Sequence, residues 1–232
     1  MVHGRRIKRQ LAMKAAAAKF EVADLQSILS LHLPMYKAKV PHYQATMLDS
    51  LLEVWRGHHD RLLDIGGGTG VIAEAMSKLF PVGEVRAIDL VDRFCKNLSI
   101  KTDCYDGRTI PFDAGTFDAA TLNNVLHHVP VAERPALLRE IRRVVNGPLY
   151  IKDHLSTGLI DDVRLTTLDA IGNIPFGGMI KAKYLSLREW QSLADMTGWK
   201  IGAIAAVRAY RHGPMAMVFP NTLETTMRLD PA

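Results

Sequence analysis

The sequence contains very few cysteines and no long apolar segment. Of its 232 residues only Cys95 and Cys104 are cysteines, and they lack the Cys-x-x-Cys spacing of many zinc and redox sites. Two cysteines are too few for a disulfide framework, which fits a reducing compartment. An apolar run of ~18 residues, long enough to cross a bilayer, occurs nowhere in the sequence, and the alanines at 15–18 are too few for a signal-peptide core. We therefore expect a soluble, cytoplasmic protein with no membrane span.

The histidines also lack the spacing of a metal site. None of the nine histidines forms a His-x-His or i, i+4 pair beside a carboxylate, and the adjacent pairs at 58–59 and 127–128 would point apart on regular structure. The sequence therefore predicts no metal cofactor.

Positive charge is concentrated at one end of the chain. The net charge is +5, but residues 1–20 hold six basic residues and no acidic one, so the rest of the chain carries −1. A nearly neutral body does not favour a nucleic-acid groove. We expect residues 1–20 to form a basic, flexible arm. The alternatives are a membrane-surface tether and a transit peptide, because the segment is rich in arginine and free of acids.

The most informative segment is residues 62–70, Leu-Leu-Asp-Ile-Gly-Gly-Gly-Thr-Gly, an apolar strand that runs into glycines and then into a helical pattern. Such glycines let the backbone approach a ligand, and the next helix points its N–H groups at the same place. About 20 residues further on, a second apolar run ends in Asp89, the position from which a carboxylate binds ribose hydroxyls. A dinucleotide fingerprint would require a third glycine where this chain has Val71.

Two later segments complete a set of four motifs. Residues 106–112 read Asp-Gly-Arg-Thr-Ile-Pro-Phe, and residues 117–128 end in Leu-His-His. With these motifs the sequence resembles the class I S-adenosylmethionine (SAM) dependent methyltransferases, especially small-molecule enzymes of the ubiquinone and menaquinone methyltransferase type. The resemblance is good over residues 61–153 and looser beyond them.

The resemblance implies that SAM is the cofactor. In the family pattern Asp89 binds the ribose, Asp106 meets the adenine amino group, and Asn123 closes over the methionine end. Asp64 would fix the glycine loop and help with the ammonium group. The expected cofactor-binding residues are Asp64, Gly66, Gly68, Thr69, Asp89, Leu90, Asp106, Gly107 and Asn123.

The alternation of short apolar strands with helical patterns predicts an α/β fold with right-handed crossovers. We expect a Rossmann-like class I methyltransferase with a mostly parallel seven-stranded sheet and helices on both faces. Residues 201–207 and 215–219 are the expected C-terminal antiparallel hairpin, and a short helix is expected after Asp89. The expected organisation is the arm at 1–20, an N-terminal helical cap at 21–57, and a SAM-binding domain at 58–232. A weakly periodic segment at about 154–183 is the expected substrate lid.

The residues around the methyl acceptor are defined less sharply. The expected catalytic residues are His154, which Asp153 could orient, and then His128, since a neutral histidine can accept a proton. Many methyltransferases use no base at all. The expected substrate-binding residues are His42, Tyr43, Asn124 and Asn173. A catechol-type magnesium site stays open as an alternative, because oxygen-bearing side chains follow strands four and five.

We expect methyl transfer to an oxygen or nitrogen of a small-molecule metabolite, planar or heteroaromatic, by a monomer or homodimer. Residues 123–125 are Asn-Asn-Val where nucleic-acid base methyltransferases usually carry a Pro-Pro-aromatic turn, so no nucleic-acid partner is expected. The alternatives are a dinucleotide-binding oxidoreductase and a catalytically silent SAM-binding partner subunit.

Overall fold

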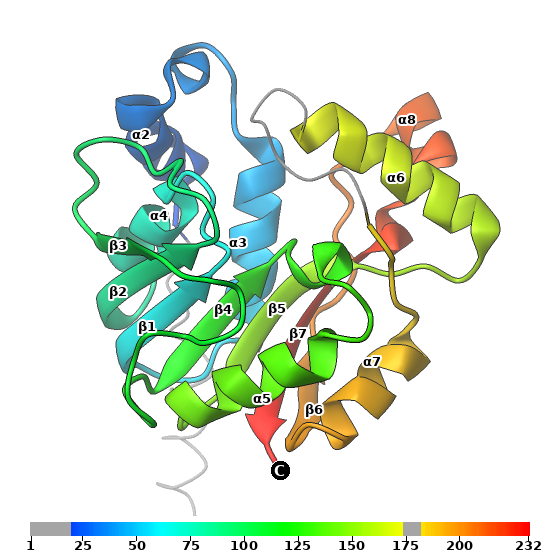
Figure 1. Ribbon diagram of the computed structural model, residues 1–232. Coiled ribbons are helices and arrows are strands. Elements are labelled where there is room, and N and C mark those ends of the chain that lie inside the picture. The colour runs from blue at the N-terminus through cyan, green and yellow to red at the C-terminus, as the bar shows by residue number, and fades with distance from the viewer. Residues whose placement is uncertain (1–19, 174–181) are drawn as a thin grey trace, which may run out of the picture.

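The computed structural model describes residues 20–173 and 182–232. Its centre is a seven-stranded sheet in the order β3-β2-β1-β4-β5-β7-β6, which is parallel except that β7 runs antiparallel to β5 and β6 (Figure 1). The strands are β1 (His59–Ile65), β2 (Val82–Asp89), β3 (Lys101–Cys104), β4 (Ala119–Asn123), β5 (Leu149–His154), β6 (Trp199–Ile204) and β7 (Glu224–Pro231). The predicted α/β fold with its C-terminal antiparallel hairpin is confirmed.

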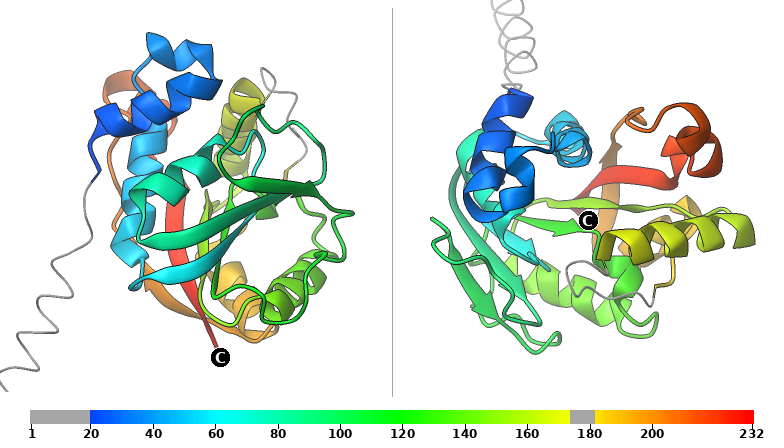
Figure 2. Two further views of the ribbon diagram at one scale, coloured as in Figure 1. Left: turned by 90° about the vertical axis from the view of Figure 1, so that its left-hand side faces the viewer. Right: turned by 90° about the horizontal axis from the view of Figure 1, so that it is seen from above.

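Helices cover both faces of the sheet, as the views in Figures 1 and 2 show. One face carries α2 (Val22–His32), α3 (His42–Val54) and α4 (Val71–Leu79), and the other carries α5 (Arg134–Val144) and α7 (Leu187–Asp195). The remaining helices are α6 (Leu159–Asn173), α8 (Gly213–Val218) and the short 3-10 turns η1 (Pro34–Lys37), η2 (Leu126–His128) and η4 (Asn221–Leu223).

The central strands are apolar because both of their faces are buried. In β1, Leu62 packs into the core under α2, α3 and α4, whereas Leu63 packs into the core under α5 and α7. The parallel strands β1, β2, β4 and β5 all end at the same edge of the sheet. Ligands of doubly wound sheets bind at that edge, so its loops form the candidate site.

The segment expected as an N-terminal helical cap, 21–57, contains α2 and α3. A capping box begins α7, since the Ser186 hydroxyl accepts from the Glu189 N–H and the Glu189 carboxylate accepts from the Ser186 N–H.

Other local predictions are wrong. Residues 90–100 contain no helix. The segment expected as the last strand, 215–219, lies mainly in α8, and the strand is β7 instead. A run of alternating apolar residues does not mark β7, because its buried positions include Thr225 and Thr226.

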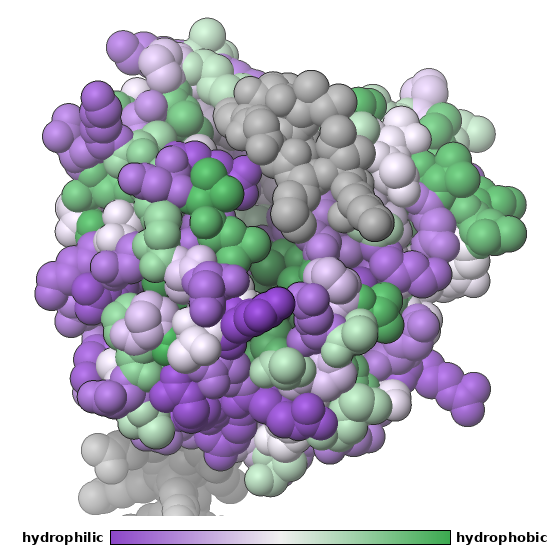
Figure 3. Space-filling model, viewed as in Figure 1, coloured by the Kyte–Doolittle hydropathy of each residue, from purple (hydrophilic) through white to green (hydrophobic). Residues whose placement is uncertain are grey.

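The weakly periodic segment after β5 contains α6, a helix of 15 residues. This helix buries little apolar surface: Leu165 is fully buried, whereas Leu159 is 82% and Val163 is 68% exposed. The apolar surface at the right-hand edge of Figure 3, where Figure 1 shows α6, reflects these exposed side chains. Within the described residues no helix is long and apolar enough to cross a membrane. Residues 1–19 and 174–181, which hold most of the expected arm and part of the expected lid, lie outside the described residues.

Candidate functional site

The glycine loop links β1 to α4 and is held against β2 by the N–H groups of Gly66 and Gly67, which donate to the Ile88 carbonyl at 2.8 and 3.0 Å. Gly66 has φ +74°, and a Cβ there would collide with Val125. Gly68 has φ +57°, but a Cβ there would meet no described atom within 4 Å. The loop is therefore closed on the Val125 side and open at Gly68, where a ligand can approach the backbone.

Asp89 lies beside this loop at the carboxyl end of β2. Its Oδ2 accepts from the Gly68 N–H at 2.7 Å and its Oδ1 from the Val91 N–H at 3.2 Å, while Arg93 lies 3.6 Å away. Each carboxylate oxygen has two acceptor sites, so both keep one for a ligand hydroxyl. The residue is only 4% exposed, and its carboxylate is held in place from both sides.

Asp106 follows β3 and closes a turn. Its Oδ1 accepts from the N–H groups of Arg108 and Thr109 at 2.8 and 2.7 Å, and these bonds lower the pKa of its carboxyl group. Burial, with the nearby charges of Asp89 and Asp106, raises the pKa of the Tyr105 phenol to about 12, so the phenol is neutral. Asp106 thus stabilises the turn through Oδ1 and also lines the cavity.

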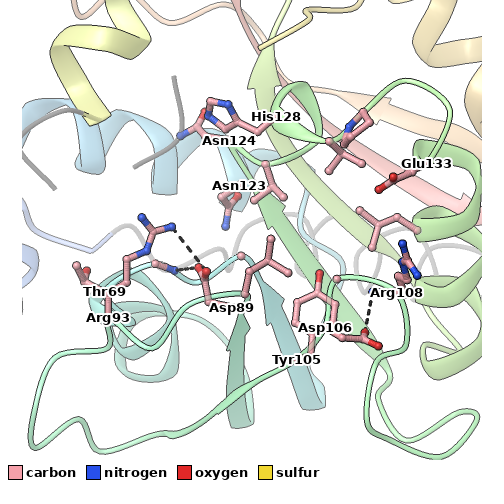
Figure 4. A pocket seen from close by; sticks show the side chains of 18 residues that line it. Thr69, Asp89, Arg93, Tyr105, Asp106, Arg108, Asn123, Asn124, His128 and Glu133 are labelled. Carbon is pink, nitrogen blue, oxygen red and sulfur yellow. Dashed lines mark hydrogen bonds and ion pairs between the residues drawn. The ribbon is translucent and has the colours of Figure 1, made fainter. Parts of the chain in front are cut away.

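A cavity of about 510 Å³ joins these elements (Figure 4). It is lined by every expected cofactor residue except Asp64. It also contains residues that sequence reasoning missed, which are Arg93, Tyr105, Arg108, Val125, Val129, Pro130, Glu133 and Leu137. Most of these lie in loops or on α5, where no motif marks them.

Asp64 is buried beneath the loop rather than in the cavity. Its Oδ1 accepts from the Thr121 hydroxyl at 2.6 Å and from Nδ2 of Asn123 at 3.3 Å. Burial raises the pKa of Asp64 to about 7, although these two hydrogen bonds lower it. Nδ2 of Asn123 points toward Asp64, and Oδ1 of Asn123 is buried with no hydrogen-bond partner in the described part of the chain. This unpaired acceptor in the cavity wall fits a ligand that brings its own donor, such as the ammonium group of SAM.

Two expected substrate residues meet on the other side of Asn123. Asn124 has φ +55°, which turns the chain sharply after β4, and its Nδ2 donates to the Tyr43 hydroxyl at 3.0 Å. Asn124 and His128 line the cavity and lie next to each other in Figure 4. Tyr43 does not line the cavity but is hydrogen-bonded to Asn124. His42 is not brought to this cavity, because it faces a separate surface hollow on the outer side of α3. Asn173 is the last residue of α6, and its side chain lies outside the described part.

The structure does not bring His154 and Asp153 to the cavity. His154 is 6% exposed, and its ring nitrogens face Glu224 at 3.2 Å and Asp169 at 3.5 Å. Burial lowers the pKa of His154, but these two carboxylates raise it above its usual value. The expectation of His154 as the first-choice base is therefore corrected, since both nitrogens already face carboxylates away from the cavity.

Asp153 orients a different histidine from the one expected. Its Oδ1 contacts Nδ1 of His127, and it also accepts from the His154 N–H at 2.7 Å. Burial lowers the pKa of His127, but Asp153 and Asp169 outweigh this effect and raise it to about 9. Sequence reasoning missed His127 and Asp169 because they come from η2 and α6, which are far apart along the chain.

The comparisons with known proteins point in one direction. The family model described as "Methyltransferase domain" matches residues 63–148, which contain all four motifs. A release factor glutamine methyltransferase from Gloeobacter violaceus is 30% identical over 138 residues, which are 54% of this chain and 46% of that protein. The chain therefore spans about half the length of this relative.

Solved structures share the fold. A putative methyltransferase from Haloferax volcanii, determined in complex with a methyltransferase activator, superposes with a TM-score of 0.63 at 16% identity over 91% of this chain and 97% of its own. Magnesium protoporphyrin IX methyltransferase from Synechocystis with bound S-adenosylhomocysteine gives a TM-score of 0.54 at 15% identity over 85% and 87%.

The family match falls on the segment that builds the cavity, and the cavity gathers the cofactor motifs around an unpaired acceptor. Residues 63–148 match the methyltransferase domain family, the chain has the fold of class I SAM-dependent methyltransferases, and the cavity fits SAM as the cofactor.

Proposed function

We propose that this chain transfers the methyl group of SAM to an oxygen or nitrogen atom of a small-molecule metabolite. One observation carries the proposal: the cavity that contains the cofactor motifs continues to Asn124 and His128 beyond Asn123. A methyl donor and an acceptor need to share one enclosed space, because the sulfonium methyl is already activated and the protein mainly aligns the reactants.

The size and lining of the cavity support a small acceptor. Its volume of about 510 Å³ lies within the range of small-molecule sites. Beside Asn123, Val125 offers an apolar wall for a planar or heteroaromatic molecule, and Asn124 supplies a polar contact. The body of the chain outside residues 1–20 carries a charge of −1, which gives a nucleic acid no general electrostatic attraction.

His128 is the side chain that we propose as the base when the acceptor is a hydroxyl. It is the last residue of η2, the turn that follows β4 after Asn124 and Val125, and it lines the cavity. The neutral imidazole would accept the proton that the acceptor loses as the methyl group is transferred, and the reaction would leave S-adenosylhomocysteine. An acceptor nitrogen with a free lone pair would need alignment only.

The relatives do not agree on an acceptor class. By its name, the Gloeobacter violaceus protein acts on a glutamine of a release factor, whereas the Synechocystis enzyme acts on magnesium protoporphyrin IX. The neighbour solved with an activator favours a second candidate, in which this chain is a SAM-binding subunit that needs a partner for turnover. We propose a monomer or homodimer that acts on a small molecule as the first choice.

The test uses SAM with a tritiated methyl group and the full chain. The chain is incubated with a cell extract that dialysis has divided into a small-molecule fraction and a macromolecular fraction. Asp89→Ala, at a SAM concentration too low for its weakened binding, is the control. The proposal expects label in the small-molecule fraction only. Label confined to protein or nucleic acid would contradict the small-molecule acceptor. SAM binding without any transfer would favour the partner-subunit alternative.

A further inference from the structure

Three buried side chains from distant parts of the sequence converge beside the candidate acceptor region. His127 lies in η2, His154 ends β5, and Asp169 projects from α6. Nε2 of His127 lies 3.3 Å from Oδ2 of Asp169, and Nε2 of His154 lies 3.5 Å from Oδ1 of the same residue. One ligand atom from each of the three side chains lies within 4.8 Å of the other two.

The other side of each imidazole faces a second carboxylate. Nδ1 of His127 contacts Asp153, and Nδ1 of His154 lies 3.2 Å from Glu224. Histidines that bind metal ions commonly have a carboxylate at the nitrogen that does not bind the metal, which fixes the tautomer and the ring orientation. His127 has that arrangement with Asp153, whereas Nδ1 of His154 lies within ion-pair distance of Glu224 without forming a hydrogen bond in the described part of the chain.

The distance between His127 and Asp169 is long for a hydrogen bond but suits two ligands of one metal ion. Nε2 of His127 is buried without a hydrogen-bond partner in the described residues, although Asp169 is its neighbour. Ligand atoms on a tetrahedral zinc ion, with bonds of about 2.0–2.1 Å, are about 3.3–3.4 Å apart. Each imidazole lies at about this separation from one oxygen of Asp169: Nε2 of His127 is 3.3 Å from Oδ2, and Nε2 of His154 is 3.5 Å from Oδ1.

Charge and burial also favour a cation at this position. The side chains of His127, His154 and Asp169 are 1%, 7% and 9% exposed. Lys152 and Arg211 both pair with Glu224, whereas neither Asp153 nor Asp169 forms an ion pair with a lysine or arginine in the described part of the chain. A buried carboxylate is costly without a countercharge, which either a protonated His127 or a bound ion would supply.

We propose that His127, His154 and Asp169 form a binding site for a divalent transition-metal ion, with zinc as the first choice. Two imidazoles and a carboxylate are ligands that zinc binds readily, and they leave a fourth position open. The same set can hold iron(II), so both ions belong in the test. This proposal goes against the expectation of no metal, because that expectation used only spacing along the sequence.

The ion would fasten α6 to the ends of β4 and β5. That helix buries little apolar surface, and its contact with the body includes Leu165 packed against Tyr184 and Leu223. The Tyr184 hydroxyl also donates to Oδ2 of Asp169 at 2.5 Å. The His127 ring lies 4.1 Å, centroid to centroid, from the ring of His128, so the metal site would adjoin the cavity without being part of it.

The deciding experiment is a metal titration of the full chain after treatment with a chelator. Isothermal titration calorimetry with Zn²⁺ and with Fe²⁺ under anaerobic conditions should give one ion per chain for at least one metal. Co²⁺ should give the visible absorption of a low-coordinate nitrogen and oxygen site. The metal should also raise the thermal unfolding midpoint, because it binds the folded chain.

Substitutions of three aspartates test whether the metal ion binds at this cluster. Asp169→Asn should abolish the Co²⁺ absorption and weaken metal binding at least 100-fold, and Asp153→Asn should weaken it about 10- to 100-fold through His127. The matched control is Asp161→Asn on the same helix, whose carboxylate contacts Arg164 and Thr157, and it should bind metal like the wild type. Binding that is equal in Asp169→Asn and the wild type would overturn the proposal, as would a folded wild type that takes up none of the three metals. If Asp169→Asn fails to fold, the wild-type stoichiometry and Co²⁺ spectrum decide. A wild type without metal would mean that the cluster is held by shared protons alone.

Discussion

Replacing Asp89 by alanine separates a ligand contact from a structural contact in the cofactor cavity. In the wild type, the carboxylate accepts one backbone N–H on each oxygen and keeps one acceptor site on each for the ribose hydroxyls. Hydrogen bonds to a charged acceptor contribute about 1.5–3 kcal/mol. We therefore expect Asp89→Ala to raise the Kd for S-adenosylhomocysteine about 10- to 150-fold.

The assay is isothermal titration calorimetry, with the thermal unfolding midpoint measured in parallel. Asp103→Ala is the matched control, because Asp103 lies on the neighbouring strand β3, pairs with Arg86 and stays outside the cavity. Its Kd should equal that of the wild type. The reasoning is refuted if Asp89→Ala folds and binds S-adenosylhomocysteine as tightly as the wild type, or if Asp103→Ala loses the same affinity.

Three further predictions follow from the same cavity. Gly66→Ala should lower the thermal midpoint more than Gly68→Ala, because both residues have a positive φ but only the Cβ at Gly66 would collide with Val125. Gly68→Ala should also weaken S-adenosylhomocysteine binding, since its Cβ points into open space at the cavity. A larger loss of thermal stability in Gly68→Ala than in Gly66→Ala would contradict the loop geometry. The folded-state pKa of Asp64 is raised from 3.8 to about 7, so the folded chain holds a proton that the unfolded chain releases, and its contribution to stability falls as pH rises between these values. Between pH 4 and 8 the free energy of unfolding, measured with urea, should fall by about 4 kcal/mol less in Asp64→Asn than in the wild type. The same pH dependence in both proteins would contradict the raised pKa of Asp64. His128→Ala should lower kcat about 10²- to 10⁴-fold on a hydroxyl acceptor, with the Kd for SAM preserved and part of the loss recovered at high pH; a loss that is equal at every pH would exclude a base.

The cofactor half of the site could be predicted from sequence because its signals are local. The positive φ angles of Gly66 and Gly68 favour glycine, and Asp89 is the last residue of its strand, so each position is marked by its neighbours in the chain. The sheet was predictable for the same reason, since β1, β2, β4 and β5 each contain a short apolar run.

The other half of the site depends on contacts between distant segments. Asn124 meets Tyr43 from α3, and His154 is turned away from the cavity by Glu224 from β7. Neither contact leaves a pattern along the chain. The strand β7 was missed for a related reason, because its buried threonines look polar in sequence.

The most direct test of the central claim is the crystal structure of this chain with bound S-adenosylhomocysteine. We expect the ribose hydroxyls on Asp89, the adenine beside Asp106 and Gly107, and the amino group of the homocysteine part near Oδ1 of Asn123. The sulfur should then face the side of the cavity formed by Asn124 and His128. A ligand bound outside this cavity, or one whose sulfur faces Arg108 and Glu133 instead, would contradict the account.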